Sequence, residues 1–109
     1  MKIDTIKLQK AIIDNKVKKG FNTTSIEQEF CFLTSEVGEA YDAYFKKKSD
    51  LGEELADIGI FLFGIAEILN FDLGKEIINK IEKNKKRKYT FINGVYEKIN
   101  EKELQSIEN

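Results

Sequence analysis

Histidine is absent from this chain of 109 residues, and so is proline. A serine or cysteine nucleophile normally relies on a histidine base, a catalytic zinc ion normally needs histidine ligands, and a di-iron helical bundle uses Glu-x-x-His motifs. The sequence therefore excludes the usual forms of these three kinds of site. Without proline, its turns depend on glycine, asparagine, serine and aspartate.

Cysteine occurs once, as Cys31, which rules out a disulfide within the chain. Its apolar neighbours Phe30, Phe32 and Leu33 favour a packing role over a nucleophilic one. No apolar run approaches the about 18 residues of a membrane span, so we expect neither a span nor a signal peptide. With a formal net charge of −1, no overall field attracts nucleic acid or a membrane surface. We expect a single cytoplasmic domain, residues 1–109, without stable nucleic-acid binding.

Apolar residues recur at helical spacing over most of the chain and predict an all-α fold. Four helices are expected. The first spans residues 3–19, and the second runs from a cap at Thr24 or Ser25 to about residue 47. The third runs from a cap at Asp50 to about residue 69, and the fourth runs from a cap at Asp72 into the basic segment 80–88. They predict a four-helix bundle with a core of about 3–89. The core side of the second helix is expected at Phe30, Leu33, Val37, Ala40 and Tyr44, whereas Glu29, Asp42 and Lys46–Lys48 are expected to be solvated.

The C-terminal tail, residues 90–109, follows a different pattern. Short apolar stretches flank Asn93-Gly94 within residues 89–98, which predicts a β-hairpin with a type I′ turn. Beyond the hairpin, the spacing predicts a last short helix near 100–107.

The third expected helix is apolar on all sides, because no charged residue occurs from Ile58 to Ile65. Such a helix must be buried all round, and four short helices do not cover it. Gly59 and Gly64 would allow another helix to approach closely. We therefore expect the protein to form a homodimer or homotetramer.

Two acidic pairs stand out against this apolar background. Glu36 and Glu39 lie on the second helix, three residues apart and so on one helical face. Glu54 and Asp57 repeat this spacing on the third helix. Because the turn near Lys46–Asp50 makes the helices antiparallel neighbours, the four carboxylates are expected to face one another. They repel unless a cation lies between them, and oxygen-only ligands select Mg²⁺, Mn²⁺ or Ca²⁺. The alternative, a solvated acidic face, is disfavoured by the apolar neighbours.

The segments around these pairs resemble the MazG-like all-α nucleoside triphosphate pyrophosphohydrolase family, which groups with dimeric dUTPases and phosphoribosyl-ATP pyrophosphatase. Thr34–Ala40 and Gly52–Ile58 are similar to the two metal-binding helix segments of that family, and Lys80–Tyr89 is similar to its phosphate-binding helix end. The resemblance covers about Ile6–Tyr89. It implies a helical dimer or tetramer that hydrolyses a nucleoside triphosphate to the monophosphate and pyrophosphate, using Mg²⁺, or Mn²⁺, held by the four carboxylates.

The resemblance also implies roles for residues outside the acidic pairs. Glu53 is a candidate for positioning the attacking water, or else only a helix cap. Phe21 lies where the family has an aromatic residue in its base pocket, and otherwise packs under the bundle. The substrate phosphates are expected at the basic segment, on Lys80, Asn84, Arg87 and Tyr89, for which the alternative is a solvated helix end.

Two other interpretations compete with this one. The chain could be an enzyme like phosphoribosyl-ATP pyrophosphatase, which shares a similar helical scaffold. It could instead be a helical dimerisation or interaction module, in which the apolar third helix is an interface and the carboxylates are incidental. The base and sugar of the substrate are not predicted by the sequence.

Overall fold

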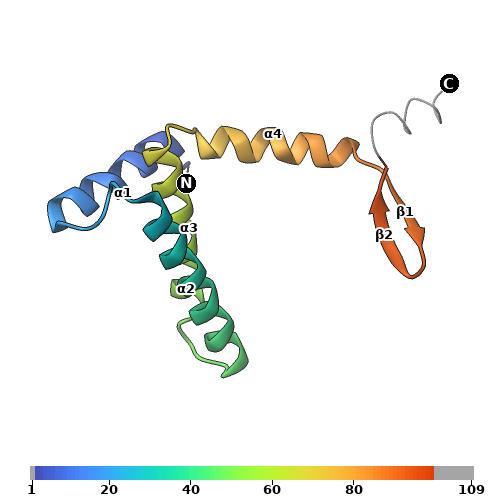
Figure 1. Cartoon of the computed structure of the whole chain (residues 1–109), viewed down its shortest axis with the longest axis horizontal. Coiled ribbons are helices and arrows are strands. Elements are labelled where there is room, and N and C mark those ends of the chain that lie inside the picture. The colour runs from blue at the N-terminus through green and yellow to red at the C-terminus, as the bar shows by residue number, and fades with distance from the viewer. Residues whose placement is uncertain (1, 100–109) are drawn as a thin grey trace. The chain divides into compact units, whose positions relative to one another are not determined.

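A computed structural model describes residues 2–99 of the protein (Figure 1). Four helices and one hairpin follow one another along the chain: α1 (Thr5–Lys19), α2 (Ile26–Phe45), α3 (Leu51–Ile68), α4 (Leu73–Lys86), β1 (Tyr89–Ile92) and β2 (Val95–Lys98). The mostly helical fold, the four helices and the hairpin are confirmed. The short helix predicted near 100–107 lies outside the described residues.

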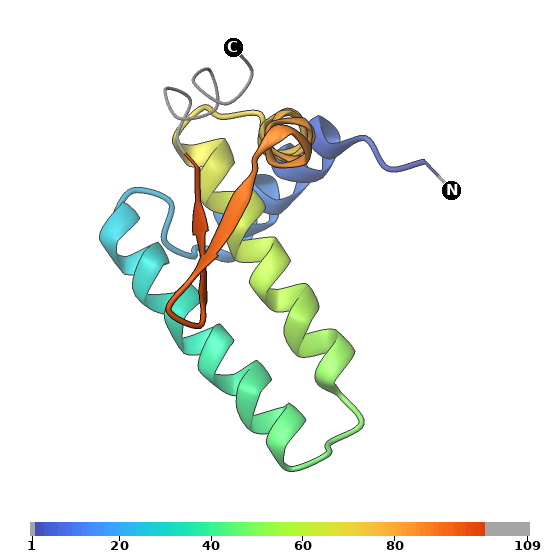
Figure 2. The ribbon, with the colours of Figure 1, turned by 90° about the vertical axis from the view of Figure 1, so that its right-hand side faces the viewer.

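These elements form two compact units, which divide between Gly74 and Lys75. In the first unit, α3 packs against both α2 and α1. Figure 2 shows α2 and α3 running antiparallel side by side, joined by the turn at residues 46–50. The second unit holds most of α4 and the hairpin.

The first three helices end in the same way, although no proline stops them. One residue within two positions of each helix end, Gly20, Lys47 or Asn70, has a positive φ of 73°, 54° or 63°. The amide after it donates to a carbonyl five residues earlier, which is a Schellman arrangement. Because Lys47 turns the chain in this way, α2 ends at Phe45, slightly before the predicted end.

The helix starts differ in how they are capped. Asp4 caps α1, since its carboxylate accepts hydrogen bonds from two backbone amides of the first turn, and α1 begins at Thr5 rather than at residue 3. Ser25, one of the two predicted caps of α2, accepts from the backbone amide of Gln28. Asp50 occupies the predicted N-cap position of α3, but its side chain makes no capping hydrogen bond.

Small side chains contribute much of the core of the first unit, where Ala40 and Ala43 of α2 are buried, as are Ile65 and Ala66 near the end of α3. The predicted core stripe of α2 is therefore only partly right. Ala40 is buried, but Val37 is 50% exposed and Tyr44 is 67% exposed. The reason is that α2 packs against α3 along a narrow strip of small residues, which leaves its larger apolar side chains outside that contact.

The rest of the described chain covers α3 on only some of its sides. Leu55 and Leu62 are exposed, whereas Gly64 lies so close to α1 that a Cβ atom there would be 3.2 Å from a methyl group of Ile12. The helix that approaches Gly64 is α1 of the same chain, while Gly59 faces open space, so the predicted approach of a partner helix stays a prediction. None of the helices within residues 2–99 combines the length and apolar character needed to cross a bilayer.

The hairpin in the second unit has the predicted turn. Asn93 and Gly94 both have positive φ, 51° and 81°, which is the type I′ geometry. Phe91 and Tyr96 are directly paired across the strands, and their ring centroids lie 5.0 Å apart. This aromatic pair stabilises the register of the two strands.

Gln9 is almost completely buried and ties three segments of the first unit together. Its Nε2 donates to Glu67 Oε2 (3.0 Å) and to the carbonyl oxygen of Phe71 (2.9 Å), and its Oε1 accepts from the backbone amide of Leu73 (2.9 Å). One side chain of α1 thus satisfies polar groups at the end of α3, in the following turn and at the start of α4.

We expect Gln9→Leu to lower the free energy of unfolding by about 2 kcal/mol or more, because buried backbone groups of Phe71 and Leu73 lose their partner. Chemical denaturation followed by circular dichroism measures this difference. The control Lys10→Leu changes an exposed neighbour on the same helix and should stay within about 0.5 kcal/mol of the unmodified protein. Equal stability of the two variants would contradict the assigned role of Gln9.

Candidate metal centre

Carboxylates from two helices converge at the α2–α3 interface. Glu36 of α2 and Glu54 and Asp57 of α3 each place one oxygen within 4.8 Å of the other two. Glu39 lies beside them, since it lines the same pocket as Glu54 and its charge acts on both Glu36 and Glu54. The structure therefore brings together the four acids singled out in the sequence. Glu53 is exposed in the first turn of α3 and is not one of the three converging residues.

Burial and crowding both disfavour the charged forms of these acids. Loss of solvent raises the pKa of Glu36 above its ordinary value, and the neighbouring Glu39, Asp57 and Glu54 raise it further. The pKa of Glu54 is also raised, first by loss of solvent and then chiefly by the charge of Glu39, while Lys48 opposes the shift. The carboxylates of the cluster thus repel one another, and a bound cation would offset this repulsion.

Two oxygens of the cluster lack a hydrogen-bond partner. Glu36 Oε2 and Glu54 Oε2 are sealed from solvent and accept no hydrogen bond from any described residue. A buried carboxylate oxygen without a partner costs free energy. A hard divalent cation would supply that partner, and oxygen donors without nitrogen or sulfur fit Mg²⁺ or Mn²⁺. The residues present therefore fit the predicted cation.

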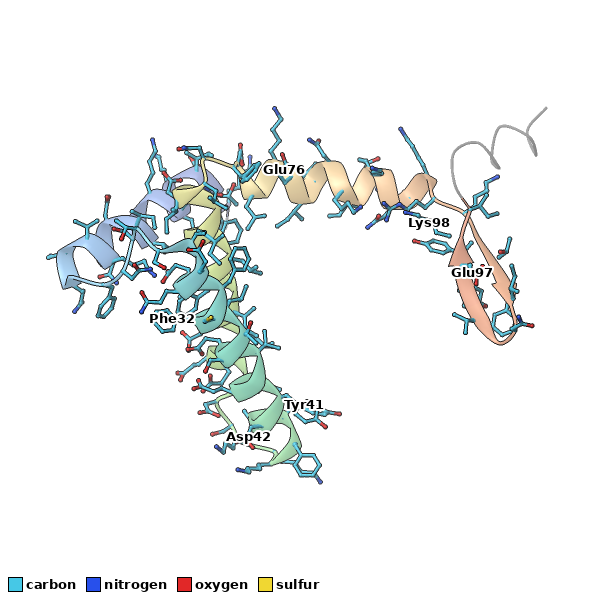
Figure 3. The ribbon with its side chains drawn as sticks, viewed as in Figure 1. Phe32, Tyr41, Asp42, Glu76, Glu97 and Lys98 are labelled. Atoms are coloured by element: carbon cyan, nitrogen blue, oxygen red, sulfur yellow. The ribbon has the colours of Figure 1, made fainter. Side chains whose placement is uncertain are left out.

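A pocket of about 420 Å³ opens beside the carboxylates, lined by Glu39, Glu54, Asp42 and Lys48 among others. Figure 3 shows Asp42 on the part of α2 that approaches the turn. Its carboxylate pairs with Lys46 (3.0 Å) and Lys48 (3.5 Å), and the hydrogen bond from Lys46 is the main cause of its lowered pKa. Asp42, Lys46 and Lys48 are exposed, as predicted, and in addition they form an ion-pair group, with Asp42 and Lys48 at the rim of the acidic site.

A second pocket, of about 340 Å³, lies where α1, the loop after it, α2 and α3 meet. Its lining is mostly apolar and includes the rings of Phe21 and Phe61 and the aliphatic side chains of Ile12 and Ile60. Phe21 is 59% exposed, so it does not pack under the bundle, which was one of its two predicted positions. An exposed aromatic ring at the edge of an apolar pocket is suited to stacking on a flat ligand.

Glu29 and Lys16 form a buried ion pair in the wall of this apolar pocket. The prediction that Glu29 is solvated is wrong, because its side chain is 1% exposed. Lys16 Nζ also lies 5.2 Å from the centroid of the Phe61 ring. The burial of Lys16 could have been predicted from its position four residues after Ile12, which places it on the apolar side of α1.

The apolar pocket and the carboxylates share the same sides of α2 and α3. Phe61 follows Asp57 by four residues and Glu36 follows Glu29 by seven, and both spacings return to the same side of a helix. At ~1.5 Å per residue, the pocket lies ~6 Å along α3 and ~10 Å along α2 from the carboxylates. A ligand that reaches both sites has an anionic end for the cation and a flat apolar end for the pocket.

The predicted phosphate-binding residues lie in the second unit. Arg87 Nη1 donates to Asn84 Oδ1 (3.0 Å), which places these two side chains together as predicted. The pKa of Lys80 is lowered, first by loss of solvent and then by the nearby cations, of which Arg87 acts most strongly. This crowding of positive charge favours an anion. Tyr89, at the start of β1, is about half exposed.

The chain matches no protein-family model, no curated protein and no solved structure. Its resemblance to the MazG-like family therefore stays a proposal, and the functional argument rests on the site itself.

In the absence of metal, the protein should lose stability as the pH rises above 4.5, the ordinary pKa of a glutamate side chain. Because the folded state raises the pKa of Glu36 and Glu54, their contribution is fully present below that pH and is lost as the pH passes through the raised values. Glu36→Gln should flatten the decline, as measured by melting temperature against pH with a chelator present. The exposed control Glu27→Gln should not change the slope. Identical slopes for Glu36→Gln and the unmodified protein would contradict the raised pKa.

Proposed function

We propose that the protein is a MazG-like nucleoside triphosphate pyrophosphohydrolase that depends on Mg²⁺ or Mn²⁺. The observation that carries this proposal is the cluster of Glu36, Glu39, Glu54 and Asp57, with two sealed oxygens that lack a partner. The apolar pocket on the same sides of α2 and α3 supports a substrate with a flat ring at one end. Together they favour a nucleotide over a simple phosphate.

The four carboxylates would hold the cation, which when bound would draw charge from the phosphate oxygens and make water a stronger acid. The reaction is attack of a water oxygen on the α-phosphorus, with cleavage of the bond to the bridging oxygen and departure of pyrophosphate. Because the chain has no histidine, the water would be activated by the cation, by a carboxylate, or by both. Glu53, exposed beside Glu54, is the proposed group for orienting this water.

Aromatic side chains of the first unit and basic side chains of the second unit are each suited to one part of a nucleotide. Phe21 and Phe61 would hold the base between aromatic surfaces. Lys80, Asn84 and Arg87 would bind the phosphates, since guanidinium gives a forked grip, ammonium a point charge and the amide a neutral donor.

The active form is proposed to be a helical bundle formed by two or more copies of the chain. Large apolar side chains remain exposed on both helices of the acidic site, among them Tyr41, Phe45, Leu55, Ile60 and Leu62. Figure 3 shows Tyr41 projecting from α2. A second copy of the chain would bury these side chains, and α3 would then be covered as its composition requires.

Pyrophosphate release from a panel of nucleoside triphosphates with Mg²⁺ and Mn²⁺ tests the proposed activity. We expect Glu36→Gln and Asp57→Asn to reduce kcat/KM by on the order of 100-fold or more, the loss typical of removing one electrostatic catalytic group. The control Glu82→Gln removes an exposed carboxylate paired with Lys85 and should leave the activity unchanged. Absence of pyrophosphate release with every nucleotide, including phosphoribosyl-ATP, would favour the interaction module instead.

Binding of the cation alone should stabilise the fold. At a hundredfold excess over the dissociation constant, Mg²⁺ or Mn²⁺ should add about 2.7 kcal/mol to the free energy of unfolding, and a chelator should remove this gain. Without metal, Glu36→Gln should be as stable as the unmodified protein or more stable, because one repelling charge is gone. A cation that stabilises Glu36→Gln and the unmodified protein equally would contradict the assigned ligands.

A further inference from the structure

The apolar pocket has one charged end, which the proposed reaction does not use. Lys16 donates to Glu29 Oε1 there, and its Nζ lies 5.2 Å from the Phe61 ring centroid. Glu29 lies seven residues before Glu36 on α2, so this charged end lies ~10 Å along that helix from the carboxylate cluster.

Asn22 fixes the position of Glu29 from the other side. Its Nδ2 donates to Glu29 Oε2 (3.1 Å) and to the carbonyl oxygen of Ser25 (2.8 Å), while its Oδ1 accepts from the backbone amide of Ser25 (3.1 Å). The loop that carries Phe21 is thereby tied to the ion pair. Asn22 is a positioning residue, which holds the loop and Glu29 in place.

A ligand in the pocket reaches Lys16 more readily than Glu29. The Glu29 side chain is 1% exposed and each of its oxygens already has a partner, whereas the Lys16 side chain is 13% exposed. An ammonium group only donates hydrogen bonds. The charged end of the pocket therefore offers a ligand a cationic donor, and a ligand group that meets it must be an acceptor.

The sugar joins a nucleobase on the side of the ring that faces the phosphates, so the atom furthest from them is the substituent at C4 of a pyrimidine or C6 of a purine. In uracil, thymine, guanine and hypoxanthine this substituent is a carbonyl oxygen, which accepts. In cytosine and adenine it is an amino group, which donates and would face the ammonium group unfavourably.

Resting on the proposed function, we infer that Lys16 is a specificity-determining residue, held by Glu29 and Asn22, and that it selects nucleotides whose base carries a carbonyl group at this position. The substrate class is thus the oxo bases, with uracil preferred over cytosine and hypoxanthine over adenine. Each of these two pairs differs chiefly in the carbonyl or amino group, so size and stacking are nearly matched. A hydrogen bond to a charged group corresponds to a preference of ~10- to 100-fold within each pair.

The test compares kcat/KM for dUTP with dCTP and for ITP with ATP, and it adds calorimetric binding of the free nucleosides uridine, cytidine, inosine and adenosine. Both measurements use the unmodified protein first. The double variant Lys16→Gln with Glu29→Gln then neutralises the pair without leaving one buried charge alone. We expect the unmodified protein to prefer the oxo base in both pairs and the double variant to lose most of that preference. A purely structural role would instead lower stability and reduce activity equally for all four nucleotides.

The outcomes separate this inference from the proposed function. Pyrophosphate release without a difference between oxo and amino bases, or with a preference that the double variant retains, overturns the inference and leaves the proposed function standing. If no nucleotide is hydrolysed, the proposed function fails, and the inference is then tested by the calorimetric binding of the free nucleosides. Binding of uridine and inosine above cytidine and adenosine then supports it, whereas equal binding or no binding overturns it. Should the double variant not fold, the two matched nucleotide pairs are compared on the unmodified protein alone. A preference for the oxo base in both pairs then supports the inference, and equal use of both bases overturns it.

Discussion

Repulsion among four carboxylates is the constraint on which the first unit depends. The α2–α3 pair holds Glu36, Glu54 and Asp57 within contact of one cation, with Glu39 beside them. This arrangement raises the pKa of Glu36 and Glu54 and leaves one oxygen of each without a partner. A helix pair selected for stability alone has no need of such a cluster. Its persistence in an otherwise apolar interface is explained if a divalent cation, bound between the helices, converts the repulsion into attraction.

The same helix pair determines the spacing between the parts of the site. Ala40 and Ala43 of α2 are buried in the first unit, where α2 packs against α3, and side chains of both helices line the space beside this contact. The carboxylates occupy one stretch of this space and the apolar pocket with Phe61 occupies the next, within one or two helical turns. The Schellman turn after α2 is centred on Lys47, and it brings Lys48 to the rim of the acidic site. The positions of the carboxylates, of the apolar pocket and of the rim charges therefore all follow from two antiparallel helices.

Local sequence patterns predicted the helices, the hairpin with its Asn93-Gly94 turn, and the convergence of the four acids, because each depends on residues close in the chain or on one short connection. Contacts between distant segments were not predictable in this way. The Lys16–Glu29 pair joins two helices, and Gln9 bonds to groups more than fifty residues away, so neither leaves a local pattern. The predicted stripe of α2 was partly wrong because periodicity marks an apolar side without showing what covers it. Asp50 stands at the predicted N-cap of α3 without a side-chain hydrogen bond, because its residue type allows this bond but does not impose the required geometry.

Anomalous X-ray diffraction from crystals of the full chain grown with Mn²⁺ tests the central claim most directly. The account predicts an anomalous peak between α2 and α3, with oxygens of Glu36, Glu54 and Asp57 at about 2.0–2.3 Å from it. Carboxylates that stay together without a peak at saturating Mn²⁺, or a peak bound by other residues, would contradict the claim that this cluster is a metal centre.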